Sequence, residues 1–441
     1  MIDVAYTWRD SELKIKPLRA LNGVGAQLSR FGVDLPSLTP SSIVRSAIKT
    51  AGSDDLGSDS YREPLEVFLA SCTGEADLTT FGRILISKML TSALANRISL
   101  HRWSVEHPEV RAERIDSPWI IVGLPRTGTS VLSMLLGLDP MARPLLQWEA
   151  AHPIPPPTLE EADQDPRIAQ TTKELDGLMK LNPPLKAMHP FGATLAQECV
   201  SLFMYDVRTL ALETQAHVPT YARWLEQADM TPAYAQHRLA LQTLQSRQPT
   251  ERWILKTPNH LWHLEALLTA YPDARIIWTH RDPGPVITSL ASLANAGQRP
   301  LTRRIDPRPT ATEWKRKCAF ALGSAVAFDE KSADGWCQHV HYDALIDDPL
   351  GAVRDLYRHF GSEVSGLHAR RMEAFLEYRP KDAFGRHRYD PADFGWTYTG
   401  LAEEFGDYIE RYHIRSEIKV DQPTGHIRSD VVGAYLSCDE G

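Results

Sequence analysis

The sequence predicts a three-layer α/β fold, in which helices flank a parallel sheet and a helical N-terminal segment is added. Three segments support this prediction, because each joins a short apolar strand to a helix through a turn: residues 118–138, 252–268 and 274–296. Strands that alternate with helices in this way form a parallel sheet. With 441 residues, of which 43% are hydrophobic, the chain can bury a large core.

The pattern along the chain predicts one α/β domain with additions at both ends. In residues 1–114 apolar side chains recur at helical spacing and no chemical motif is present. We therefore expect this segment to serve in packing, as a substrate lid or as an oligomer contact. Residues 115–415 are predicted to form the α/β domain, which includes a helix over 194–210. Residues 416–441 are predicted to be a C-terminal tail.

The most informative segment is the turn at residues 123–130, G-L-P-R-T-G-T-S, between an apolar strand and a helix. Backbone N–H groups of such a turn and the positive end of the helix point at an anion. The spacing G-x-x-x-x-G is that of the Walker nucleotide loop, but Thr129 stands where that loop has lysine. The cation of the turn is Arg126, which comes earlier. The turn therefore indicates a nucleotide-phosphate site without the usual triphosphate chemistry.

Two later segments bring charged residues to strand ends. The strand that begins at residue 252 ends at Lys256, and the strand that begins at residue 274 delivers Arg281. Ser289 lies eight residues after this arginine, in the next predicted helix, so that the two side chains can clamp one phosphate. Ligands of open α/β sheets bind at the carboxyl ends of the strands. We expect both segments to face one crevice with the first turn.

Together, the motifs G-L-P-R-T-G-T-S, L-K-T-P-N-H and T-H-R-D-P-x-x-V-x-x-S resemble the sulfotransferases that use 3′-phosphoadenosine 5′-phosphosulfate (PAPS). The chain is most similar to the bacterial branch with arginine in the first loop, and it shares features with tyrosylprotein sulfotransferases. The resemblance covers residues 115–415. It implies a P-loop-like fold and an enzyme that moves a sulfuryl group from PAPS to an acceptor hydroxyl. The products are then a sulfate ester and 3′-phosphoadenosine 5′-phosphate.

The resemblance also implies the site residues. The expected 5′-phosphosulfate site consists of Arg126, Thr127, Gly128, Thr129 and Ser130. The expected 3′-phosphate site consists of Arg281 and Ser289, and a later basic loop adds Lys381, Arg386 and Arg388. Sulfuryl transfer gains most from positioning and from nearby positive charge. Arg126 and Lys256 are expected to supply that charge at the transferring group, so that no metal ion is needed.

Two residues are candidates for the base that takes the acceptor proton. Glu149 follows the first helix at nearly the distance at which the tyrosylprotein branch has its glutamate. His260 stands two positions beyond the catalytic histidine of cytosolic sulfotransferases. We favour Glu149 over His260. The simpler alternatives are that Glu149 pairs with Arg143 and that Arg281 pairs with Asp282 or Asp273.

Composition limits the classes of molecule that the protein is expected to bind. The net charge of −8 and the lack of a basic tract argue against nucleic acid. Five scattered cysteines indicate a reducing compartment, and no apolar run approaches the length of a membrane span. We therefore expect a cytoplasmic protein that acts on a small-molecule or lipid-like hydroxyl acceptor. Whether it forms a homo-oligomer stays open.

Two other functions stay open at this point. One is a nucleotide kinase of the P-loop type, against which the missing loop lysine already argues. The other is a non-catalytic nucleotide-binding module that keeps the fold without turnover.

Overall fold

A central five-stranded parallel sheet organises the protein, whose computed structural model describes residues 5–378 and 386–418. The strand order is β3 (Ala142–Pro144), β4 (Arg252–Lys256), β2 (Trp119–Val122), β5 (Arg275–His280) and β6 (Cys337–His341). A separate parallel pair joins β1 (Ala5–Tyr6) to β7 (Arg386–His387). Neighbouring strands of the five-stranded sheet all run parallel. The predicted α/β fold is thereby confirmed.

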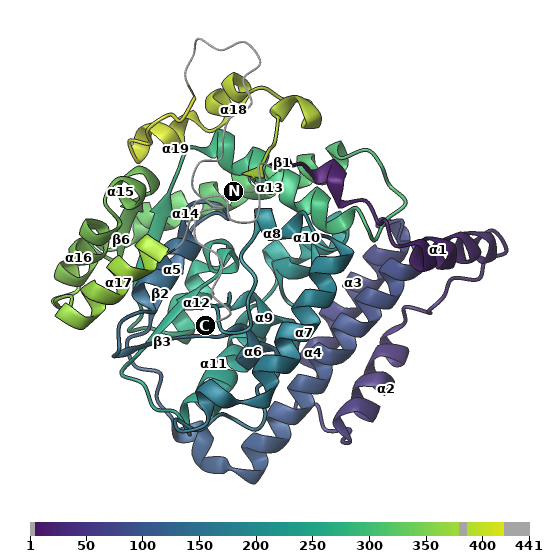
Figure 1. Cartoon of the computed structure of the whole chain (residues 1–441), viewed down its shortest axis with the longest axis horizontal. Coiled ribbons are helices and arrows are strands. Elements are labelled where there is room, and N and C mark those ends of the chain that lie inside the picture. The colour runs from purple at the N-terminus through teal and green to yellow at the C-terminus, as the bar shows by residue number, and fades with distance from the viewer. Residues whose placement is uncertain (1–4, 379–385, 419–441) are drawn as a thin grey trace.

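Alternate side chains of the strands pack on opposite faces of the sheet, which explains the continuous apolar runs. On one face, Trp119 and Ile121 pack with apolar residues of α5 (Thr129–Leu136), α15 (Tyr342–Asp347), α16 (Pro349–His359) and α17 (Gly366–Tyr378). On the other face, Ile120 and Val122 belong to a core with α11 (Thr231–Gln245), α12 (Leu264–Ala270), α13 (Pro283–Gln298) and α14 (Arg308–Lys331). These helices and the sheet form the three layers (Figure 1).

The N-terminal helices lie along one side of the molecule, on the right in Figure 1. They are α1 (Lys16–Ser29), α2 (Pro40–Ala51), α3 (Arg62–Gly74) and α4 (Thr80–Glu106). Phe68 of α3 and Ile98 of α4 are fully buried and belong to the same apolar cluster as Ile120 of the sheet. The core is therefore continuous from these helices into the α/β layers.

Further helices complete the structure: α6 (Gln147–Ala151), α7 (Pro166–Leu181), α8 (Leu185–Met188), α9 (Val200–Phe203), α10 (Pro219–Gln227), α18 (Tyr398–Glu404) and α19 (Gly406–Arg411). The helix predicted over 194–210 is wrong in extent, since only α9 and short 3₁₀ turns form there. Backbone bonds to other segments hold the preceding loop: Gln197 N–H donates to Leu145 O, and Cys199 N–H donates to Lys256 O. No helix among residues 5–378 and 386–418 has the length and apolarity needed to cross a bilayer.

A buried ion pair ties α4 to the α/β body. Arg97 of α4 and Asp206 are both fully buried, and Arg97 Nη1 lies 2.6 Å from Asp206 Oδ1. Arg97 also donates to the Leu56 and Ser58 carbonyl oxygens, and Asp206 pairs with Arg208 as well. An ion pair of this kind is stable only while each charge keeps its partners.

Removing one charge of this pair should therefore destabilise the protein. We expect Asp206→Ala to lower the free energy of unfolding by about 3–5 kcal/mol, because Arg97 is left buried without its anion. Urea denaturation followed by circular dichroism measures this. As a control, Asp59→Ala removes an exposed ion pair with Arg62 and should leave the midpoint unchanged. Equal midpoints for the two variants would contradict the assignment.

Candidate functional site

The turn between β2 and α5 has the geometry of an anion cradle. Gly128 has a φ of +87° and caps α5 at its N-terminus. A Cβ atom there would lie 3.0 Å from the Leu345 and Tyr342 side chains, so glycine is required in both conformation and space. The N–H groups of residues 127–130 have no hydrogen-bond acceptor within the described parts of the chain. These donors and the helix end are therefore available to an anionic group.

Arg126 joins two of the predicted motifs. Its φ of +74° turns the side chain back across the site, where Nε donates to Ser289 Oγ at 3.0 Å and Nη1 donates to Met188 O at 2.5 Å. Burial, with a smaller contribution from Arg281, lowers the pKa of Arg126 to about 10, although Tyr389 opposes this. The first turn and the Arg281–Ser289 motif thus meet at one place.

Arg281 follows β5 directly and is almost fully buried. Its Nη1 donates to Arg126 O at 2.7 Å, and its guanidinium lies 3.8 Å from the centre of the Tyr342 ring. Nε and Nη2 pair with the two carboxylate oxygens of Glu417 at 2.6 and 2.9 Å. Burial lowers the pKa of Arg281, but the Glu417 carboxylate outweighs it and the net shift is upward.

The partner of Arg281 differs from those considered from the sequence. Asp282 accepts the N–H groups of Gly284 and Glu417, and Asp273 accepts the N–H of Ser117. The anion comes instead from Glu417, in the predicted C-terminal tail. No local pattern marks this residue, because it lies 136 positions from Arg281.

Lys256 ends β4 next to the first turn, and its side chain is only 2% exposed. Its Nζ donates to Ser130 Oγ at 2.9 Å and to Glu198 Oε1 at 2.8 Å. His189 Nε2 lies 3.9 Å from the same carboxylate oxygen. Burial raises the pKa of Glu198, but Lys256 and His189 outweigh it and lower the pKa to about 2. Glu198 is therefore an anion near neutral pH.

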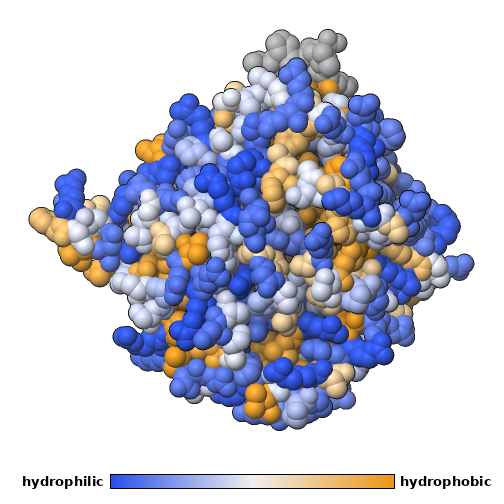
Figure 2. Space-filling view, turned by 180° about the vertical axis from the view of Figure 1, so that it is seen from behind, coloured by the Kyte–Doolittle hydropathy of each residue, from blue (hydrophilic) through white to orange (hydrophobic). Residues whose placement is uncertain are grey.

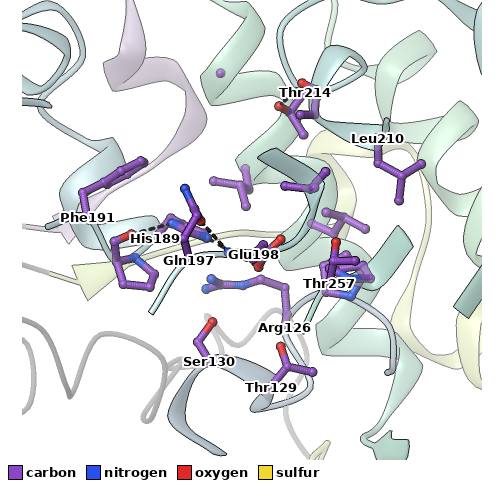
Figure 3. Close-up of a pocket in the computed structure, with 18 of the residues that line it drawn as sticks. Arg126, Thr129, Ser130, His189, Phe191, Gln197, Glu198, Leu210, Thr214 and Thr257 are labelled. Atoms are coloured by element: carbon purple, nitrogen blue, oxygen red, sulfur yellow. Dashed lines mark hydrogen bonds and ion pairs between the residues drawn. The ribbon is translucent and has the colours of Figure 1, made fainter. Parts of the chain in front are cut away.

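The polar end of a pocket of about 340 Å³ is formed by Arg126, Thr129, Ser130, His189 and Glu198 (Figure 3). Lys256 contacts this end through Ser130 and Glu198. Ser130 and Thr129 lie at the turn, and Glu198 and His189 lie across from them, with Arg126 between. The rest of the wall is mostly apolar, and it includes Val131, Met134, Leu178, Leu185, Phe191, Leu210, Leu290, Leu293 and Trp314. A ligand with a polar head and an apolar body fits such a lining.

Neither of the two bases predicted from the sequence lines this pocket. Glu149 opens α6, where one carboxylate oxygen pairs with Arg143 and the other accepts the Leu146 N–H at 3.0 Å. This arrangement is the simpler alternative considered for Glu149. His260 is fully buried and its Nδ1 lies 2.8 Å from the Tyr234 hydroxyl oxygen. Burial lowers the pKa of His260 well below its ordinary value.

His260 also belongs to a buried cluster with Cys199 and His237, whose ligand-type atoms lie within 4.8 Å of one another. Each imidazole Nδ1 contacts a tyrosine hydroxyl, of Tyr234 or Tyr271. Burial lowers the pKa of both imidazoles, so each ring is neutral, and both rings pack against Phe203. We assign the cluster to core packing.

The late basic loop is described only in part. Lys381 lies outside the described residues. Arg386 is in β7, and the exposed Arg388 donates its backbone N–H to Tyr6 O at 2.8 Å. The adjacent Tyr389, which the sequence did not single out, is buried beside Arg281 and Arg126 and next to Ser289. The late loop therefore lies next to Arg126 and Arg281 through the side chain of Tyr389.

The comparison with solved structures supports the fold over most of the chain. The sulfotransferase STF1 from Mycobacterium tuberculosis H37Rv is 33% identical, with a TM-score of 0.76 over 84% of this chain and 98% of that one. The sulfotransferase STF9 from Mycobacterium avium is 30% identical, with a TM-score of 0.80 over 88% of this chain and all of that one.

A curated relative is the omega-hydroxy-beta-dihydromenaquinone-9 sulfotransferase Stf3 of Mycobacterium tuberculosis (strain CDC 1551 / Oshkosh), which is 26% identical over 259 residues. The match covers 56% of this chain and 63% of that protein, which is less than two thirds of its length. The family profile described as "Sulfotransferase family" matches residues 118–366, from the strand before the anion cradle through the sheet. The chain therefore belongs to the sulfotransferase family.

Proposed function

We propose that this protein is a PAPS-dependent sulfotransferase that acts on an acceptor hydroxyl. One observation carries the proposal: the N–H donors of the cradle lie between two buried cations, Lys256 on β4 and Arg281 after β5. Two separate positive positions suit a donor that carries charge at both its 5′ and 3′ ends. Membership of the sulfotransferase family supports the same donor class.

In this proposal the residues of the site divide between the two ends of the donor. The N–H groups of residues 127–130, with Arg126 and Lys256, hold the 5′-phosphosulfate. Arg281 and Ser289 hold the 3′-phosphate, and Tyr389 beside them closes that position. Arg281 pairs with Glu417, so a 3′-phosphate must displace this carboxylate before it binds.

We assign the role of base to Glu198 in place of Glu149 or His260, because Glu198 lines the pocket and contacts Lys256. The acceptor oxygen attacks sulfur, the bond from sulfur to the bridging phosphate oxygen breaks, and the acceptor proton moves to the Glu198 carboxylate. Lys256 turns toward the transferring group and stabilises its oxygens. This movement removes the charge that depresses the pKa of Glu198, so the carboxylate becomes a stronger base when the donor is bound.

The apolar wall of the pocket favours a lipid-like acceptor. About 340 Å³ admits the end of an alkyl or isoprenoid alcohol, with its hydroxyl at Glu198 and its chain along Leu210, Leu290 and Leu293. The relative Stf3 is named for a menaquinone substrate, which is also a lipid-like molecule. Because Arg126 and Lys256 supply the positive charge, we propose that the reaction needs no metal ion.

We also keep the prediction of a reducing, cytoplasmic compartment. The four described cysteines, Cys72, Cys199, Cys318 and Cys337, are free and buried. Burial raises the pKa of Cys199 to about 12, so its thiol is protonated and unreactive.

Donor binding should depend on the 3′-phosphate. We expect 3′-phosphoadenosine 5′-phosphate to raise the melting temperature without Mg²⁺, whereas adenosine 5′-phosphate and ATP have little effect. Arg281→Ala should lose the difference between the nucleotides with and without the 3′-phosphate, because the guanidinium that recognises it is gone. Differential scanning fluorimetry measures each shift. Equal stabilisation of the unaltered protein by the nucleotides with and without the 3′-phosphate would contradict the assignment of the 3′-phosphate site. Stabilisation by ATP that depends on Mg²⁺ would favour a kinase.

The Glu417 carboxylate should compete with the donor. We expect Glu417→Gln to tighten binding of 3′-phosphoadenosine 5′-phosphate by about tenfold, since the amide is a weaker partner for Arg281. Isothermal titration calorimetry at one salt concentration checks this. The matched control is Glu403→Gln, an exposed glutamate of α18. Weaker binding in Glu417→Gln would mean that Glu417 supports the donor site instead.

Glu198→Gln should lower kcat by about 10²–10⁴-fold, because the amide cannot take the acceptor proton. In the free protein the pKa of Glu198 is about 2, so kcat/KM should not fall as the pH drops from 8 to about 5. Only protonation of the carboxylate, at lower pH, removes the base. Steady-state sulfation of a medium-chain alcohol over this pH range measures both effects.

Two further variants serve as comparisons at saturating donor. Glu149→Gln should reduce stability, since it weakens a buried pair with Arg143, but folded protein should keep its kcat. His260→Gln should likewise act through packing. Normal turnover in Glu198→Gln together with a loss in Glu149→Gln would return the role of base to Glu149.

A further inference from the structure

Helix α1 lies at the margin of the apolar core, which it contacts through the half-buried Leu18. Gly25 is its single buried residue and packs against Thr80 of α4, where a Cβ atom would lie only 1.7 Å from Thr80 Oγ1. On the same side, Asn22 Oδ1 accepts the N–H of Phe81 at 2.9 Å. In Figure 1 the helix projects from the right-hand edge of the molecule. The other residues of the helix are exposed or half-buried.

The first solvent-facing side is an apolar stripe. At 3.6 residues per turn, five apolar residues share one side of the helix, which lies next to the side of Gly25. They are Pro17, Ala20, Leu21, Val24 and Leu28. Val24 is 62% exposed, and just beyond the helix Phe31 is 82% and Leu35 50% exposed. Large apolar side chains exposed in this number within one short segment are unusual for a surface that stays in water.

The second solvent-facing side is basic. Lys14, Lys16, Arg19 and Arg30 lie on or next to the helix, and residues 13–33 contain no acidic side chain. Among the residues that the structure describes, none of these four cations forms an ion pair. The chain as a whole has a net charge of −8, so this concentration of positive charge is local. Figure 2 shows the projecting arm at its left edge, where orange and blue residues lie side by side.

We propose that residues 14–35, the N-terminal arm, dock this protein on the surface of an anionic lipid bilayer. An apolar stripe flanked by cations is the arrangement of helices that lie in a membrane interface. The stripe enters the boundary between headgroups and acyl chains, and the cations contact lipid phosphates. A second copy is a poorer occupant, because two arms would bring eight cations together with only two carboxylates, those of Asp34, each of which already faces Arg83.

This inference goes beyond the proposed function and does not depend on turnover. The two are nevertheless compatible, since a lipid-like acceptor resides in the membrane to which the arm would bind. Docking brings the pocket and its acceptor into one small volume, which raises the encounter rate. No step of sulfuryl transfer involves the arm.

Co-sedimentation with vesicles tests the proposal. We expect the full chain to bind vesicles of equal parts phosphatidylglycerol and phosphatidylcholine, to bind pure phosphatidylcholine far less, and to dissociate as salt rises from about 0.1 to 0.5 M. Replacing two apolar residues, Val24→Asp with Phe31→Asp, should weaken binding by about tenfold or more. The matched control is Val105→Asp, an equally exposed valine (61%) near the far end of α4.

Two measurements keep the outcome unambiguous. The melting temperature of each variant shows that it folds, and sulfation of a water-soluble short-chain alcohol should be the same for the Val24–Phe31 double variant as for the unaltered chain. Binding that does not distinguish the two vesicle types, or that survives the double substitution, overturns the proposal. A dimer of the unaltered chain in light scattering, converted to monomer by the double substitution, would also overturn the proposal. The apolar stripe would then pack against a second copy of the chain. Loss of turnover in the unaltered chain would affect the proposed function alone.

Discussion

The structure depends on keeping three buried cations together at one edge of the sheet. Arg126, Lys256 and Arg281 are each less than a tenth exposed, and like charges so close repel one another unless oxygen atoms lie between them. The protein provides those oxygens itself. Ser289 and the Met188 carbonyl hold Arg126, Glu198 holds Lys256, and Glu417 holds Arg281.

This arrangement links fold and chemistry. Parallel strands place their carboxyl ends at the same edge, so β2, β4 and β5 deliver the cradle, Lys256 and Arg281 to neighbouring positions. The anions that neutralise these cations are also the groups that a sulfated nucleotide would replace. Exchange of Glu417 for a 3′-phosphate, and of Glu198 for a sulfuryl oxygen, would keep the charges balanced while it frees Glu198 to act as a base.

The pocket beside the cations has the opposite character. Its walls come from α5, α7, α13 and the loop around Leu210, and they are largely apolar. A site with a charged end and an apolar body selects molecules with the same division, which is why we favour a lipid-like alcohol over a sugar or a protein side chain. The exposed apolar and basic sides of α1 suggest the same environment from a distant part of the chain.

The sequence by itself determined the α/β class, the sulfotransferase motifs and the residues of the anion cradle. These are local properties: a strand, a turn with a left-handed glycine at position 128, and a helix follow one another within 20 residues. Tertiary structure alone decided the partners of each charge. Glu198 meets Lys256 across 58 residues, and Glu417 meets Arg281 across 136. Glu149 instead forms an ion pair with Arg143, which lies close to it in the sequence. Spacing along a chain fixes which backbone shapes are available, but which carboxylate reaches a buried cation depends on how distant segments pack, and no local pattern contains that information.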